Sequence, residues 1–312
     1  MQRSLLNIPE SIRSRLLNIA HSHGENYNAL LRRYFQERLL FRIARSELGE
    51  RLYLKGGLLL VAYGLPAPRA TVDIDFLGHE LANRPDEIRT AFARAAALPF
   101  LEDGVLFDGD SISSNPIRAD AEYLGVRLKV VGHLGVARLP ISVDVAFGSP
   151  FQTDELIDYP VLLGDIPAPR VRAYSLDYAV SEKFEAMVHL GLDNSRHKDF
   201  YDVWYIAQHR NFLMGPLQSA VKSTFGYRGT SLSRRVTVFD DAFSSSIDRQ
   251  HAWQAWLARI DLVAPKDFVD VMHTVIEFLE PVCEEHAEDK HWDQVSQTWI
   301  SELTNDSTGF SP

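Results

Sequence analysis

Two aspartates separated by a single residue, Asp73 and Asp75, lie in a segment of alternating polar and apolar residues, 71–77, which predicts a β-strand. Side chains two positions apart on a strand point to the same face, so the two carboxylates should project together. Like charges this close are unfavourable unless a cation lies between them, and Mg²⁺ characteristically takes one or two carboxylates plus substrate phosphates. A pair of solvated surface carboxylates is the alternative. The intervening apolar side chains are expected in the core: Val72, Ile74 and Phe76.

A third carboxylate, Asp144, stands between two valines in another predicted strand, 139–147. Burying a carboxylate is costly unless it is paired or binds a metal. Asp144 is therefore either a hydrogen-bonded core residue or a further member of the cluster formed by Asp73 and Asp75.

A glycine pair, Gly56 and Gly57, precedes a short apolar helix that is expected to run to Gly64. Glycine lets the backbone approach an anion closely, and a helix N-terminus offers free N–H groups. A glycine pair at a helix start is common, so it carries little weight alone. Together with three carboxylates, it indicates a site for a triphosphate and a metal ion.

The elements around these residues combine helices and strands. A helix over 26–48 is predicted by apolar residues at helical spacing, and further elements are a helix at 86–97 and a strand at 123–131. Within 26–48 a row of arginines shares one face, as either a solvated surface or a contact for a phosphate-bearing ligand: Arg38, Arg42 and Arg45.

The second half of the chain reads as helical. One helix over 175–190 carries Lys183, and another begins near His197. Asp199 and Asp202 lie one turn apart opposite its apolar stripe, so both aspartates can face the strand that carries Asp73 and Asp75. Further helices are expected at 214–225, 248–260 and 266–280. The predicted fold class is α+β, a mixed sheet with flanking helices. Its parts are an N-terminal helical segment 1–50, a core 51–165, a helical lobe 166–303 and a disordered tail 304–312.

Composition restricts the function further. The chain has 312 residues with 32 basic and 42 acidic side chains, a net charge of −10 that argues against nucleic-acid binding by bulk electrostatics. The longest apolar stretch, 57–63, is too short to cross a membrane, and the N-terminus lacks the apolar segment of a signal peptide. One cysteine, Cys283, excludes an internal disulfide and a cysteine-rich zinc site. A cytoplasmic protein is expected.

The order of these motifs resembles the nucleotidyltransferase superfamily and, more narrowly, the AbiEii/AbiGii toxin family of type IV toxin–antitoxin and phage-abortive systems. The resemblance spans about residues 10–290. It is carried by the following segments: 32–42, 54–58 (Leu-Lys-Gly-Gly-Leu), 69–76 (Arg-Ala-Thr-Val-Asp-Ile-Asp-Phe), 141–145 (Ile-Ser-Val-Asp-Val), 181–187 and 194–202.

The resemblance implies a nucleotidyltransferase-like sheet and assigns roles to particular residues. Asp73 and Asp75 would hold Mg²⁺, with Asp144 completing the carboxylate cluster. Lys183 and Asp199 match family positions needed for activity; Lys183 would contact the triphosphate, and Asp199 would act as a base or orient a substrate. Arg69 would touch phosphate or pair with Asp73, and Gly56 and Gly57 would offer backbone N–H groups to the nucleotide.

The resemblance also implies transfer of a nucleoside monophosphate from an NTP to an RNA acceptor such as a tRNA 3′ end, with growth inhibition as the outcome. An antitoxin encoded nearby would be the partner, with or without direct binding. Two alternatives stay open. One is a transferase acting on a small molecule or a protein, and the other is a degenerate nucleotide- or partner-binding module without catalysis.

Overall fold

The computed structural model describes residues 7–66, 70–119, 123–148, 155–260, 264–284 and 290–301, without the side chains of 118, 119, 123 and 124. The chain divides into two compact units, Met1–Ser175 and Leu176–Pro312. The N-terminal helices belong to the same unit as the sheet that follows them. The tail expected at 304–312 lies outside the described residues.

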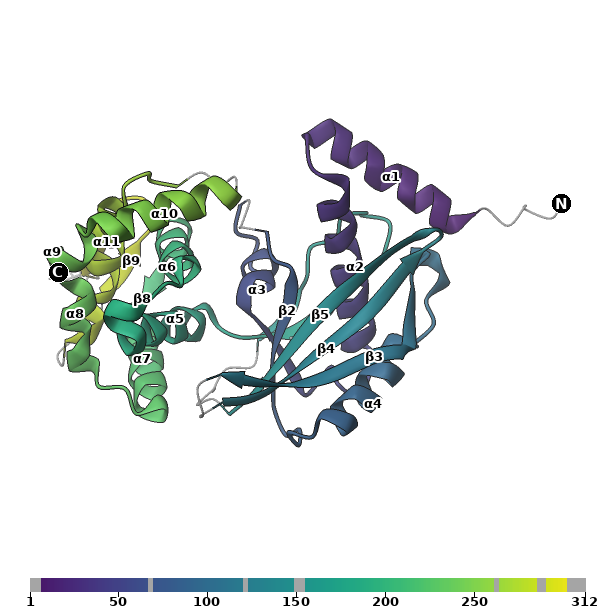
Figure 1. Cartoon of the computed structure of the whole chain (residues 1–312), viewed down its shortest axis with the longest axis horizontal. Coiled ribbons are helices and arrows are strands. Elements are labelled where there is room, and N and C mark those ends of the chain that lie inside the picture. The colour runs from purple at the N-terminus through teal and green to yellow at the C-terminus, as the bar shows by residue number, and fades with distance from the viewer. Residues whose placement is uncertain are drawn as a thin grey trace, which may run out of the picture. The chain divides into compact units, whose positions relative to one another are not determined.

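The first unit is built on a seven-stranded mixed sheet with the order β3-β4-β5-β2-β1-β7-β6. Figure 1 labels four of these strands, β2 to β5. The central strand β2 pairs in parallel with β5 and antiparallel with β1. The strands are β1 Leu52–Lys55, β2 Asp73–Gly78, β3 Leu106–Ala119, β4 Tyr123–Leu134, β5 Ala137–Phe147, β6 Glu155–Asp158 and β7 Arg170–Ala173.

Four helices accompany this sheet: α1 Ile8–His23, α2 Tyr27–Ala44, α3 Gly56–Ala62 and α4 Pro85–Ala96, with a short 3₁₀ turn at Leu101–Asp103. The side chain of Asn26 caps α2 by accepting from two backbone N–H groups. Helix α2 ends at Ala44, one turn before the end of the predicted helix 26–48. Helix α2 contacts β5 and α4, and α4 contacts β3, so these helices cover one face of the sheet (Figure 1).

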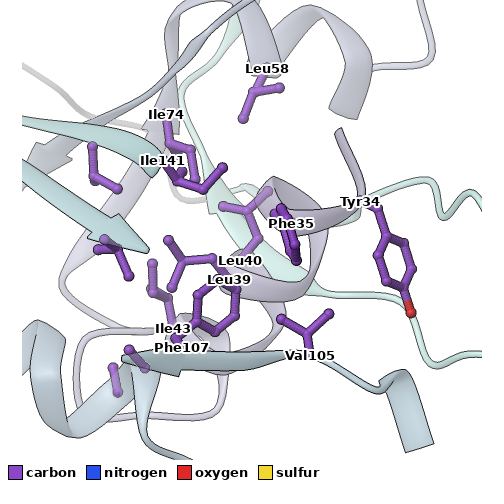
Figure 2. Close-up of a cluster of buried hydrophobic side chains, with 14 of the residues drawn as sticks. Tyr34, Phe35, Leu39, Leu40, Ile43, Leu58, Ile74, Val105, Phe107 and Ile141 are labelled. Carbon is purple, nitrogen blue, oxygen red and sulfur yellow. The ribbon is translucent and has the colours of Figure 1, made fainter. Parts of the chain in front are cut away.

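The core lies between that face and α2. Figure 2 shows Ile74 of β2 and Ile141 of β5 in one cluster with Phe35, Leu39 and Leu40 of α2, all of them buried. Because Ile74 and Phe76 enter the core, the alternation of the strand directs Asp73 and Asp75 to the opposite face. The prediction was wrong for Val72: its side chain is 54% exposed, because β2 begins only at Asp73.

The sequence interpretation of the arginine row on α2, as a solvated surface or a contact for a phosphate-bearing ligand, was wrong for Arg38 and Arg42. Arg38 and Arg42 are 0% and 3% exposed. Arg42 binds both carboxylate oxygens of Asp103, at 2.7 and 3.1 Å, and Arg38 pairs with Glu37 at 2.8 Å. Only Arg45, at the end of the helix, is exposed. These arginines neutralise buried carboxylates within the fold.

The second unit is mainly helical, as predicted, but it also contains a small sheet of order β10-β9-β8. Trp292 of β9 is fully buried, and its indole N–H donates to the Ala207 carbonyl at 2.7 Å. Its elements are α5 Leu176–Leu190, α6 His197–His209, β8 Phe212–Leu213, α7 Met214–Arg228, α8 Val236–Phe239, α9 Asp241–Ser244, α10 Ile247–Ile260, α11 Phe268–Leu279, β9 Lys290–Asp293 and β10 Thr298–Ser301, with 3₁₀ turns at Gly191–Asp193, Leu232–Arg235 and Pro281–Cys283. None of the helices described here is long and apolar enough to cross a membrane.

Candidate active site

Three carboxylates meet on the sheet face opposite α2. In the parallel pairing of β2 and β5, Asp75 lies directly beside Asp144, and Asp73 lies beside Ser142. Neighbouring strands are about 4.8 Å apart, and paired residues direct their side chains to the same face. All three aspartates are half-buried. Strands far apart in the sequence therefore bring the predicted acidic residues onto one surface.

The glycine pair shapes the edge of this surface. Gly56 begins α3 with a φ of +67°, a left-handed conformation that favours glycine. A Cβ at Gly56 would overlap the Asp75 carboxylate, with only 2.7 Å to its Cγ, and a Cβ at Gly57 would lie 2.8 Å from Cβ of Thr71. In this structure, the acidic group packed against Gly56 is therefore the protein's own Asp75. Binding of a nucleotide by the backbone here stays a prediction.

Asp144 is already paired. Arg127 of β4 lies beside it in the strand register, and its guanidinium donates from Nε and Nη2 to the two carboxylate oxygens at 2.7 and 2.6 Å. This hydrogen-bonded pair raises the pKa of Arg127, and the negative charges of Asp73 and Asp75 add to the effect. The structure thus shows Asp144 as a paired carboxylate at the edge of the cluster, with 18% of its side chain exposed.

The chemistry of the donors fits a hard divalent cation at Asp73 and Asp75. Two carboxylates on one face are the number that Mg²⁺ usually takes from a protein, and the missing side chain at position 56 makes room for the Asp75 carboxylate itself. Across the described part of the chain, no group of three or more His, Cys, Asp or Glu side chains is arranged to hold a metal ion. Ligation by Asp144 remains a prediction.

A second charged cluster lies in the second unit, between α5 and α6. The Lys183 ammonium donates to Asp202 Oδ2 at 2.6 Å and to Asp199 Oδ1 at 3.4 Å. Both aspartates are buried: Asp199 is 1% exposed and Asp202 is 0% exposed. The partly exposed Arg196 also pairs with Asp199, with 2.7 Å between its Nε and Oδ2 of Asp199. Asp199 and Asp202 do share a face of the helix, as predicted, and that face binds Lys183. The lysine is 13% exposed, so it is not a surface lysine that extends into solvent.

The predicted site residues therefore fall into two clusters, each within its own unit: Asp73, Asp75 and Asp144 with Gly56 and Gly57, and Lys183 with Asp199. Arg69 lies outside the described residues. Sequence reasoning missed Arg127, and it missed that Lys55 pairs with Asp75 in the strand register. The alternation within 123–131 placed Arg127 on the polar face of its strand, but gave no indication of the residue opposite it.

A mixed sheet that presents a carboxylate pair beside a glycine-initiated helix defines the class, an α+β protein with a candidate phosphoryl-transfer site. The family model of the AbiEii nucleotidyl transferase toxin, type IV toxin–antitoxin system, matches residues 38–291. The chain belongs to this family. No curated protein matches the sequence.

Two solved structures are similar to the chain. JHP933 from Helicobacter pylori is 15% identical, with 82% of this chain and 94% of that chain covered and a TM-score of 0.49. A second Helicobacter pylori protein, provisionally described as a nucleotidyltransferase, is 17% identical, with 84% and 100% covered and a TM-score of 0.44.

Proposed function

We propose that this protein is a Mg²⁺-dependent nucleotidyltransferase that moves a nucleoside monophosphate from an NTP onto an RNA acceptor, with a tRNA 3′ end as the first candidate, and thereby inhibits growth. The observation that carries the proposal is the register of β2 and β5, which puts Asp75 beside Asp144 with Asp73 on the same face. Membership of a nucleotidyl transferase toxin family supports the reaction class.

In the proposed reaction, an acceptor hydroxyl attacks the α-phosphorus of the NTP and pyrophosphate leaves. Mg²⁺ bound by Asp73 and Asp75 would neutralise the charge that develops on the phosphate oxygens. Asp144, once released from Arg127, would serve as a further ligand or orient the acceptor hydroxyl. Lys183 would bind the triphosphate as a point charge, and Asp199 would hold that lysine in place or accept a proton. Backbone N–H groups at the start of α3 would contact the nucleotide.

The test is incubation of the purified protein with each labelled NTP, Mg²⁺ and total RNA. Label should enter RNA with the wild-type protein and be lost with Asp75→Asn, because that change removes a charged metal ligand. Asp158→Asn is the matched control, since Asp158 is an exposed aspartate on β6 of the same sheet. Label in protein or in a small molecule would contradict the RNA acceptor. Equal growth inhibition by wild type and Asp75→Asn would contradict catalysis.

The family also supports a partner. We propose that a neighbouring gene encodes an antitoxin that relieves growth inhibition. Coexpression tests this role, and copurification with the tagged toxin tests direct binding.

A further inference from the structure

Arg127 is placed where the charges of the carboxylate cluster converge. One row across the sheet, from β1 to β4, consists of Lys55, Asp75, Asp144 and Arg127 in register. In this row Arg127 binds both oxygens of Asp144, and Asp73 and Asp75 add to the raised pKa of its guanidinium. The guanidinium therefore binds one carboxylate of the cluster and lies on the same face of the sheet as the other two.

The hydrogen bonds from Arg127 to Asp144 account for the separation of Asp144 from the other two carboxylates. Asp75 and Asp144 are direct neighbours on adjacent strands, and Asp73 shares their face, so three oxygen donors should lie within reach of one ion. Yet these described side chains do not form a group that can hold a metal. Arg127 lies on β4, on the side of β5 away from β2, and its two hydrogen bonds draw the Asp144 carboxylate toward β4.

The pair of Arg127 and Asp144 is partly open to solvent. The side chain of Arg127 is 46% exposed and that of Asp144 is 18% exposed. Ion pairs open to solvent contribute little to stability because water and salt screen them. The buried pair of Arg42 and Asp103 in the same unit, 3% and 0% exposed, holds a permanent structural position. Arg127 and Asp144 form a pair that is more open to solvent, and it can separate without exposing the core.

We propose that Arg127 is a resident counter-ion of the carboxylate cluster, which holds Asp144 away from Asp73 and Asp75 until a divalent cation replaces its charge. The inference rests on the proposed function only for the location of the metal site. Arg127 is a positioning residue in this scheme: it sets the affinity of the cluster for the cation through Asp144. Removing the guanidinium frees the Asp144 carboxylate from its two hydrogen bonds, so that it can approach the cation.

The test is titration of the purified full chain with Mn²⁺ in the absence of nucleotide, followed by electron paramagnetic resonance of the free ion. Arg127→Met should bind Mn²⁺ about tenfold more tightly than wild type, because the released Asp144 carboxylate becomes available as a third oxygen donor. The matched control is Lys129→Met, which removes the same charge from the same strand and face, opposite Ser142 rather than an aspartate. It should stay within about twofold of wild type, because its charge is not bound to the cluster.

A second variant separates the proposal from a general electrostatic effect. Adding Asp144→Asn to Arg127→Met should remove most of the gain, because the gain comes through the freed carboxylate. Equal or weaker Mn²⁺ binding by Arg127→Met would overturn the proposal, as would the same gain in Lys129→Met. Circular dichroism confirms that each variant is folded. The readout needs no turnover, so it stands apart from the success or failure of the labelling experiment.

Discussion

At Gly56 the lack of a side chain determines where a carboxylate lies. The left-handed backbone turns the chain from β1 into α3, and the space that a Cβ would fill is taken by Asp75. A glycine at position 56 thus serves two purposes. It adopts the left-handed backbone of the turn, and it leaves room for the carboxylate of the candidate site. The two requirements can be separated by substitution.

Gly56→Ala should weaken Mn²⁺ binding and nucleotidyl transfer by at least about tenfold, because the added Cβ displaces the Asp75 carboxylate. A tenfold loss corresponds to about 1.4 kcal/mol of binding free energy. It should also destabilise the fold by about 1–2 kcal/mol, the cost of a left-handed non-glycine residue. Gly229→Ala is the matched control: Gly229 has a φ of +65° and open space around it. A control variant that lost activity equally would show that backbone strain alone is responsible. Urea unfolding and Mn²⁺ titration measure the two effects.

Arg42→Met should lower the free energy of unfolding by about 3–5 kcal/mol, because it leaves the Asp103 carboxylate, 0% exposed, without its partner. Arg45→Met on the same helix should cost less than about 1 kcal/mol, because Arg45 is exposed. Urea unfolding followed by circular dichroism gives both values. Similar losses in the two variants would contradict the buried role of Arg42.

Glu37 makes the stability of the first unit depend on pH. Burial raises the pKa of its carboxyl to about 7, although Arg38 and Arg33 oppose the shift and the Leu162 N–H donates to it. The folded protein therefore binds more protons than the unfolded chain between about pH 4.5 and 7, so stability falls as the pH rises through this window. The slope is at most about 1.4 kcal/mol per pH unit.

The glutamine in Glu37→Gln cannot ionise. The free energy of unfolding of the wild type minus that of this variant should therefore fall from pH 5 to 7. It should be level above about pH 8, where Glu37 is ionised in both states. Urea unfolding at fixed ionic strength across this range provides the measurement. A difference that stays constant with pH would mean that Glu37 has an ordinary pKa in the folded protein.

Among the elements, α5 and α6 are joined by a cluster of charged side chains. Lys183 compensates two carboxylates that are almost fully buried, Asp199 and Asp202. A catalytic role and a structural role for Lys183 predict different effects of its removal on stability. If Lys183 acts only on substrate, its removal should leave stability unchanged.

Lys183→Met should lower the free energy of unfolding by about 3–5 kcal/mol, because the buried Asp202 carboxylate loses its ion pair with the ammonium and Asp199 is left with the pair it makes with Arg196. Adding Asp202→Asn should recover part of the loss, and this coupling marks the direct contact. Lys183→Arg keeps the charge, so it should fold well while transferring nucleotide more slowly, since a planar guanidinium does not reproduce a point charge. If Lys183→Met were as stable as wild type, a structural role of Lys183 in compensating the buried aspartates would be excluded.

The elements also show what sequence can predict. Alternation identified β2, and helical spacing identified α2 and α6, because each buries a regular face. β3 was missed because it is rich in Asp, Gly, Ser, Asn and Pro, which are disfavoured in strands. It forms the edge of the sheet, where proline is tolerated. The partners Asp103 of Arg42 and Arg127 of Asp144 lie on other elements, and spacing within one element carries no information about them.

On the scale of the whole molecule, the division into two compact units gives a spectroscopic advantage. All five tryptophans belong to the second unit: Trp204, Trp253, Trp256, Trp292 and Trp299. Tryptophan fluorescence therefore reports on this unit alone, while far-ultraviolet circular dichroism reports on both. Units with separate cores can unfold at different denaturant concentrations.

In urea we expect the two signals to give transitions that do not coincide. Arg42→Met, a change in the first unit, should move the circular dichroism transition to lower urea and leave the fluorescence transition in place. Parallel shifts of both signals would show that the two units unfold as one cooperative body.

The pairing of β2 with β5 has a consequence for synthesis. Asp75 is made well before Asp144, and the whole of β3 and β4 must leave the ribosome before β5 can insert beside β2. A nascent chain that ends anywhere before β5 has no assembled carboxylate cluster. The candidate metal site therefore forms only after most of the first unit has been translated, and a chain that ends before β5 lacks it.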